Sequence, residues 1–180
     1  PISRVEDFLP LFRKHLPIEI LVVAFGPILY APLEASALDD HRAMLELNYL
    51  LPVGLVEAAV QGMIDREFGR IIVFGGTATE RIRGFKSIPA YSAAKTALGS
   101  YVKSTAKRVA GTGVTINAIC PDHVHTEYLT EAEVEGYSHQ MPQGALISVE
   151  EVAGSVTYLT SSAAAAVNGQ ILVLDQGRQR

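Results

Sequence analysis

The sequence predicts an α/β protein in which helices cover both faces of a doubly wound parallel sheet. Short runs of apolar and β-branched residues alternate along the chain with longer segments of helical periodicity, and only short links separate them. Such strands are typical of parallel sheets buried on both faces, whose consecutive strands are joined by right-handed helical crossovers. No repeat, low-complexity tract or linker divides the 180 residues, so we expect one domain over 1–180.

Four apolar runs are expected to form the strands of this sheet. Each is rich in Val, Ile or Leu and is bounded by glycine, proline or polar residues, as buried strands usually are. The predicted strands cover 18–26 (IEILVVAFG), 70–76 (RIIVFGG), 114–120 (VTINAIC) and 170–175 (QILVLD).

The segments between the strands carry helix start and stop signals. Capping boxes, in which a serine and a glutamate three residues later satisfy each other's backbone N–H groups, are expected at Ser3–Glu6 and Ser148–Glu151. Proline suits the first turn of a helix, and glycine commonly follows the last. The predicted helices cover 2–12, 36–68, a segment from Ser87 or Pro89 to Gly111, and 148–160; the stretch from Glu127 to Gly144 is expected to be a substrate-facing loop.

Composition narrows the possible partners. The net charge is −4 and no Lys/Arg-rich run is present, which argues against nucleic acid or an anionic membrane as a partner. No uninterrupted apolar stretch reaches the roughly twenty residues of a membrane-spanning helix, and the first residues lack a signal-peptide pattern. The single cysteine, Cys120, excludes an internal disulfide, so we expect a cytoplasmic protein. Pro1 is expected to be the cut end of a longer chain.

The stretch Ala90–Thr96 (AYSAAKT) carries the first candidate catalytic residues. Tyr91 and Lys95 are four residues apart, so they lie on the same face of a helix, one turn from each other. A free tyrosine has a pKa near 10 and is a poor base at neutral pH, whereas a nearby ammonium favours the phenolate. The spacing therefore predicts that Lys95 lowers the pKa of Tyr91 and makes it a general acid/base.

Asn48 is a third candidate because a proline follows it by four residues. Pro52 has no N–H, so it cannot donate the helical hydrogen bond that the carbonyl of Asn48 would otherwise accept. The sequence thus predicts a free main-chain carbonyl at Asn48. The alternative is that Pro52 only kinks a long helix at a packing constraint.

Six stretches follow one another over nearly the whole chain: ILVVAFG, LNYLLP, GRIIVFGG, YSAAKTAL, VTINAICPDHVHT and NGQILVLDQG. Together they resemble the short-chain dehydrogenase/reductases, and within them the 3-oxoacyl-carrier-protein reductase-like branch. The resemblance implies a Rossmann-like fold that is incomplete at the N-terminal end. It also implies a nicotinamide-dependent interconversion of a ketone and a secondary alcohol, with a 3-oxoacyl thioester or similar carbonyl as substrate.

The resemblance also implies roles for particular residues. Tyr91 would donate a proton to the carbonyl oxygen, Lys95 would hold the nicotinamide ribose, and Asn48 would hold a water in a proton relay. The cofactor, NAD or NADP, would further contact Gly26, Pro121, Val124 and Thr126. The long helix and the tyrosine helix would form the interface of a homodimer or homotetramer.

The sequence departs from the family in four places. It has no Gly-x-x-x-Gly-x-Gly turn for the pyrophosphate, and Val-Ala-Phe-Gly stands where the family has Asn-Asn-Ala-Gly. The family's catalytic serine is absent: strand alignment places Gly76 there, and counting back from Tyr91 places Ala78. Thr77 lies between them and has the same hydrogen-bonding capacity as serine, so we predict it as the replacement. Asp122 replaces a glycine, and its carboxylate would repel cofactor phosphates unless it points away.

Two further groups are weaker candidates for binding. Arg81, Arg83 and Lys86 precede the tyrosine helix and predict a site for an anionic substrate handle, such as a phosphopantetheine arm or an acidic carrier surface; the alternative is a solvated loop. The alternating His123, His125 and Glu127 could ligate a metal, but a polar loop is the preferred interpretation, and no metal site is expected.

Two other functions remain open at this point. One is a cofactor-free lyase related to the haloalcohol dehalogenases, although Lys95 and the missing serine disfavour it. The other is a truncated or degenerate homologue that serves as a non-catalytic subunit of an oligomer.

Overall fold

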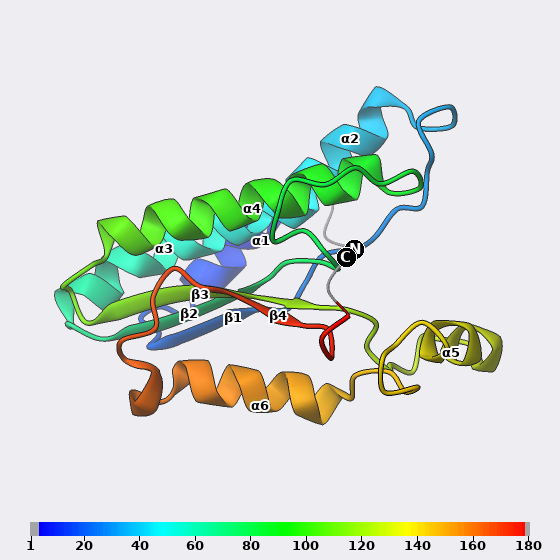
Figure 1. Cartoon of the computed structure of the whole chain (residues 1–180). Coiled ribbons are helices and arrows are strands. Elements are labelled where there is room, and N and C mark those ends of the chain that lie inside the picture. The colour runs from blue at the N-terminus through cyan, green and yellow to red at the C-terminus, as the bar shows by residue number, and fades with distance from the viewer. Residues whose placement is uncertain (1–3, 179–180) are drawn as a thin grey trace.

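The computed structural model describes residues 4–178, which contain a four-stranded sheet in the order β1-β2-β3-β4 (Figure 1). All three pairings are parallel; for example, Val23 lies opposite Val73, which lies opposite Ala118. The predicted parallel sheet is therefore confirmed, and each predicted strand is present. The strands are β1 (Ile20–Val23), β2 (Gly69–Phe74), β3 (Val114–Pro121) and β4 (Ile171–Leu174).

Helices lie on both faces of the sheet. Figure 1 shows α1 (Val5–Arg13), α3 (Leu51–Asp65) and α4 (Pro89–Arg108) on one face and α6 (Val149–Thr160) on the other. Successive residues of a strand point to opposite faces, so β2 serves two cores. Ile71 packs in the cluster under α3 and α4, whereas Ile72 packs with Leu159 of α6.

The long helix is not uniformly α-helical. It consists of α2 (Leu38–Leu45), a π-helical turn η1 (Glu46–Leu50) and α3, and the N–H of Leu51 donates to the carbonyl of Glu46, five residues back. The π turn lies directly before Pro52, where the sequence predicted a disturbed helix. The free carbonyl of Asn48 stays a prediction.

Some helix boundaries differ from the expected ones. The long helix begins at Leu38 rather than Ser36, because the Asp40 carboxylate accepts a hydrogen bond from the N–H of Ala37, at 2.8 Å. In α1 the residue before the first turn is Arg4, which makes no side-chain cap; the predicted Ser3 cap lies outside the described residues. The capping box of α6 at Ser148–Glu151 is confirmed.

The expected loop after β3 contains a helix. Thr130 and Glu133 form a capping box that begins α5 (Glu131–Ser138), and the hydrogen bond from the N–H of Thr130 to the Glu133 carboxylate is 2.9 Å long. The prediction of a loop over 127–144 is therefore wrong for Glu131–Ser138. A short 3₁₀ turn, η2 (Ser162–Ala164), follows α6.

By length and composition alone, the continuous helix Leu38–Asp65 could cross a membrane. Core helices meet the same criterion, and this helix contacts α1, α4 and three strands of the sheet. Its apolar composition thus serves the packing between layers. The absence of a membrane partner stays a prediction.

Candidate active site

Four separate segments meet at the carboxyl ends of β1 and β2. α4 contributes Tyr91 and Lys95, η1 contributes Asn48, and the residues that follow β1 and β2 contribute Gly26 and Gly76. This edge is where open parallel sheets commonly place their ligand sites. The structure therefore brings together the residues that the sequence singled out far apart along the chain.

Lys95 is tied to the end of β2. Its side chain is 3% exposed, and Nζ donates a hydrogen bond to the carbonyl oxygen of Phe74 at 2.8 Å. Nζ lies 5.8 Å from the centroid of the Tyr91 ring, as expected for side chains one helical turn apart. Burial lowers the pKa of Lys95 to about 8, and Cys120 opposes that shift.

Gly26 allows Asn48 and Lys95 to approach the end of β1. A Cβ atom at residue 26 would lie 2.7 Å from Nζ of Lys95 and would collide with Oδ1 of Asn48, and the φ of +154° is one that side chains rarely adopt. Asn48 is fully buried, and its Nδ2 donates to the carbonyl of Pro27 at 3.0 Å. Its Oδ1 has no hydrogen-bond partner in the described structure, which leaves a buried acceptor pointing at this junction.

The hydroxyl of Tyr91 occupies the space above Gly76. A Cβ atom at residue 76 would lie 2.6 Å from Oη of Tyr91 and 2.9 Å from its Cε1. In the present position of Tyr91, no side chain at residue 76 fits. Gly76, which strand alignment places at the position of the family's serine, is thus required to be glycine by its contact with Tyr91.

Burial dominates the acidity of Tyr91. Desolvation, assisted by Cys120 and Tyr30, raises the pKa of Tyr91 to about 12. The prediction that Lys95 lowers this pKa is wrong for this structure, because the phenol is largely buried and the ammonium hydrogen-bonds a carbonyl instead. Tyr91 therefore keeps its proton at neutral pH and can act as a proton donor.

The low pKa of Lys95 predicts a pH-dependent contribution to stability. Between about pH 8 and 10.5 the unfolded chain holds the Lys95 proton while the folded chain does not, so the free energy of unfolding rises with pH. Relative to Lys95→Met, the wild-type protein should gain about 3 kcal/mol over this window. Urea denaturation of both proteins at pH 7.5 and 10.5 measures the gain, and a difference that does not change with pH would contradict it.

Two threonines follow Gly76, and they have different surroundings. Thr79 is 2% exposed; its Oγ1 accepts from the N–H of Gly76 at 2.9 Å and donates to the carbonyl of Gly76 at 3.0 Å, so it braces the turn. Thr77 is half-buried, and its Oγ1 lies 3.5 Å from the carbonyl of Pro121, a long contact. The hydroxyl of Thr77 is therefore held by weaker hydrogen bonding than that of Thr79. The catalytic role of Thr77 stays a prediction.

The carboxylate at residue 122 is neutralised by a cation that the sequence reasoning overlooked. Asp122 and Arg178 form an ion pair of 2.8 Å, and both side chains are 6% exposed. The guanidinium also donates to Oε1 of Gln140 at 2.9 Å. The predicted repulsion of phosphates by Asp122 is therefore opposed by Arg178. An aspartate in place of a glycine beside a strand end was a signal that a cation is needed nearby.

The segment after β3 is held by a short parallel contact. Val124 pairs with Ile147, and the N–H of His125 donates to the carbonyl of Ile147 at 2.8 Å. Pro121 ends β3, and the carbonyl of Thr126 accepts from the N–H of Leu129 at 3.2 Å. These hydrogen bonds fix the positions of Pro121, Val124 and Thr126. Their contacts with a cofactor stay predictions.

The alternating His and Glu residues do not assemble a metal site. Among residues 4–178, no group of three or more His, Cys, Asp or Glu side chains is placed to hold a metal ion. The ring of His123 instead stacks on Tyr137 of α5, with centroids 4.2 Å apart, and lies beside Asp122. Burial lowers the pKa of His123, which favours the neutral ring in this stack.

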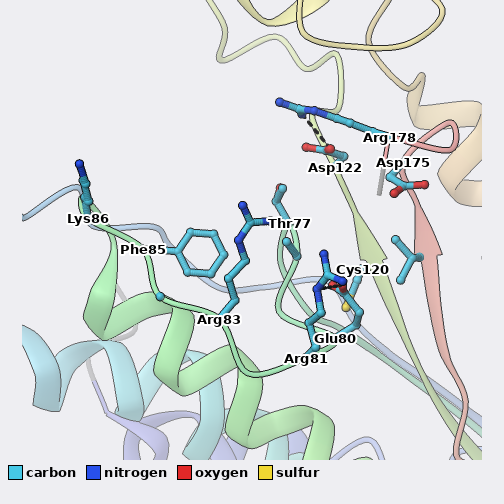
Figure 2. Close-up of a pocket in the computed structure, with 13 residues that line it drawn as sticks. Thr77, Glu80, Arg81, Arg83, Phe85, Lys86, Cys120, Asp122, Asp175 and Arg178 are labelled. Atoms are coloured by element: carbon cyan, nitrogen blue, oxygen red, sulfur yellow. Dashed lines mark hydrogen bonds and ion pairs between the residues drawn. The ribbon is translucent and has the colours of Figure 1, made fainter. Parts of the chain in front are cut away.

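A cavity of about 530 Å³ adjoins this site and collects the predicted cationic residues (Figure 2). Its wall includes Thr77, next to Gly76, and Cys120, whose thiol has a pKa raised to about 11 by burial. Tyr91 and Lys95 do not line it, so the cationic cavity and the tyrosine junction are neighbouring but distinct places. The lining includes Arg81, Arg83, Lys86 and Arg178 together with Glu80, Asp122 and Asp175.

Comparison with known proteins identifies the family. Residues 11–179 match the family described as enoyl-(acyl carrier protein) reductase. A solved oxidoreductase of the short-chain dehydrogenase/reductase family from Burkholderia thailandensis has a TM-score of 0.85 and 30% identity, covering 98% of this chain and 70% of that chain. The chain therefore belongs to the short-chain dehydrogenase/reductase family of oxidoreductases.

Two curated relatives have more specific names. The chain is 32% identical over 166 residues to 2-dehydro-3-deoxy-D-gluconate 5-dehydrogenase of Pseudoalteromonas atlantica, covering 89% of this chain and 64% of the relative. It is 31% identical over 142 residues to the 3-oxoacyl-[acyl-carrier-protein] reductase of Escherichia coli, covering 77% and 57%. The chain thus spans less than two thirds of the length of these relatives.

A 3-oxoacyl (acyl-carrier-protein) reductase from Agrobacterium tumefaciens C58, solved with NADP bound, also shares the fold. Its TM-score is 0.86 at 24% identity, over 98% of this chain and 70% of that chain.

Proposed function

We propose that the protein is an NAD(P)-dependent oxidoreductase that interconverts a ketone and a secondary alcohol. The observation that carries the proposal is the junction at the ends of β1 and β2, where Tyr91, Lys95, Asn48 and Gly26 lie together although η1 and α4 are far apart in sequence. A tyrosine that keeps its proton at neutral pH, beside a buried ammonium, suits protonation of a carbonyl oxygen.

The proton can be replaced from within the same junction. Because the pKa of Lys95 is lowered to about 8, its ammonium can give up a proton near neutral pH. The buried Oδ1 of Asn48 has no partner in the described structure and offers an acceptor for a bridging water. We infer that Tyr91 delivers the proton and that Lys95 and Asn48 relay its replacement from solvent.

The residues present fit the nicotinamide half of a cofactor. Gly26 presents bare backbone where a side chain would block approach, and Lys95 would hold a ribose hydroxyl. Pro121, Val124 and Thr126 would contact the carboxamide and the nearer phosphate. When bound, the cofactor supplies or accepts the hydride. The neighbour solved with NADP and the relatives named dehydrogenase or reductase support this assignment.

The substrate is proposed to be a 3-oxoacyl thioester or a similar carbonyl compound. The relatives named for 3-oxoacyl-carrier-protein reduction and for oxidation of a deoxygluconate support a ketone or secondary alcohol on a chain that also carries an acidic group or an acyl carrier. In the absence of a side chain at Gly76, we propose that the hydroxyl of Thr77 polarises the carbonyl.

We also propose that the protein works as a homo-oligomer. α3 and α4 lie side by side on one face of the sheet (Figure 1), and Leu38, Leu45 and Leu50 of the long helix are 65%, 41% and 44% exposed. An apolar surface of this kind suits a second copy of the chain.

Titration of the full-length protein with NADH and NADPH, followed by fluorescence, tests the function. We expect saturable binding of at least one nucleotide, together with oxidation of that nucleotide when a 3-oxoacyl thioester is added. Failure to bind either nucleotide would overturn the proposal and favour a non-catalytic subunit.

A further inference from the structure

The cavity beside the tyrosine junction is built from three parts of the chain that meet at the ends of the strands. The loop between β2 and α4, the end of β3 and the residues after β4 all contribute to its wall (Figure 2). Thr77 lines the cavity, while the adjoining Gly76 touches Tyr91. The wall of the cavity therefore begins one residue from the glycine that contacts Tyr91.

The cavity has one more positive than negative side chain in its wall. Two of its four cations are matched: Arg81 lies 3.3 Å from a carboxylate oxygen of Glu80, and Arg178 pairs with Asp122 at 2.8 Å. Arg83 and Lys86 form no ion pair within residues 4–178. The third carboxylate, Asp175, accepts from the N–H of Gly177 and lies beside β4, across the cavity from Arg83 (Figure 2).

Arg83 is oriented by an aromatic neighbour rather than by a carboxylate. Its guanidinium carbon lies 5.7 Å from the centroid of the Phe85 ring, within the range of a cation–π contact. Among residues 4–178 the guanidinium of Arg83 has no carboxylate partner, so its N–H groups can take an oxygen ligand. A planar guanidinium matches the two oxygens of a carboxylate or phosphate, which an ammonium such as that of Lys86 cannot do alone.

We propose that Arg83, assisted by Lys86, binds a monoanionic oxygen group carried by the carbonyl substrate. The group is either a carboxylate on the substrate itself or the phosphodiester of a pantetheine arm. This inference rests on the proposed function, in which the carbonyl lies at Tyr91. A carboxylate and a phosphodiester each carry a single negative charge, and the planar guanidinium of Arg83 can bind two oxygens of either group.

Binding of small probes in an NMR titration of the full chain tests this site without requiring turnover. The probes are acetoacetate, its neutral methyl ester, and dimethyl phosphate as a phosphodiester monoanion. We expect an anionic probe to shift the backbone amides of Thr77 and Gly84, which line the cavity. Arg83→Gln should raise the Kd of that probe on the order of tenfold, as expected for loss of a hydrogen bond to a charged group.

Lys107→Gln is the matched control, since it removes one exposed cation from the distant end of α4. Arg83-dependent binding of acetoacetate assigns the site to a substrate carboxylate, and the same dependence for dimethyl phosphate alone assigns it to a pantetheine arm. Equal binding of acetoacetate and its methyl ester, or equal loss in both variants, would overturn the proposal. The titration contains no nucleotide and measures binding alone, so its result is independent of whether the protein catalyses the proposed reaction.

Discussion

Replacing Tyr91 by phenylalanine is expected to lower kcat for ketone reduction by about 10²- to 10⁴-fold, the usual contribution of a positioned general acid. The variant loses the hydroxyl that is proposed to donate the proton; with a pKa of about 12, this hydroxyl stays protonated at neutral pH. The ring itself remains, so its packing against Gly76 and the fold should be preserved. Steady-state kinetics and a thermal denaturation curve separate the two effects.

Tyr49→Phe provides a matched control, because Tyr49 lies in η1 and packs edge-on against Tyr101, away from Gly76. It should leave kcat nearly unchanged. Thr77→Val completes the comparison: if its hydroxyl polarises the carbonyl, kcat should fall on the order of a hundredfold. Near-normal turnover of Tyr91→Phe would remove Tyr91 as the proton donor, and near-normal turnover of Thr77→Val would remove Thr77 from the mechanism.

Replacing Arg178 by leucine is expected to lower the free energy of unfolding by about 3 kcal/mol. The change leaves the Asp122 carboxylate, 6% exposed, without its cation at the end of β3. Removing one partner of a buried ion pair is costly because the other charge stays desolvated. Urea denaturation at neutral pH measures the loss.

The exposed pair Arg42–Asp39 supplies the control for this experiment. Its N–O distance of 2.7 Å is as short, but the two side chains are 68% and 86% exposed. Solvent screens such pairs, so Arg42→Leu should have a much smaller effect. The double variant Asp122→Leu with Arg178→Leu should recover part of the lost stability. Equal effects of Arg178→Leu and Arg42→Leu would show that burial does not determine the value of the Asp122 pair.

The strands and the layers of this fold follow from local patterns. Apolar runs of 4 to 8 residues became β1 to β4. The central strands β2 and β3 are buried on both faces as expected, whereas Ile20 and Val22 of β1 are 49% and 41% exposed. α5 was missed although Thr130 and Glu133 form the same capping box that correctly located α6. Its helix has no buried residue in the described structure, so no apolar periodicity accompanied the cap.

The candidate site was only partly predictable. The spacing of Tyr91 and Lys95 placed them on one helical face, and the structure adds Asn48 and Gly26 at the same junction. The direction of the Tyr91 pKa could not be read from that spacing, because it depends on burial by segments remote in sequence. The ion-pair partner of Asp122 could not be predicted from the sequence either, because Arg178 lies 56 residues further along the chain.

The π turn before Pro52 makes the position of Asn48 depend on the number of residues as well as on their identity. Each residue of an α-helix turns the chain by about 100°, and a π turn accommodates one extra residue without breaking the helix. α2 and α3 therefore share an axis but are out of phase, and Asn48 lies in the turn where that phase changes. Deletion of one residue from Glu46–Leu50, with the rest of the helix unchanged, would rotate α2 relative to α3. The junction would then keep its tyrosine and lysine and lose its amide.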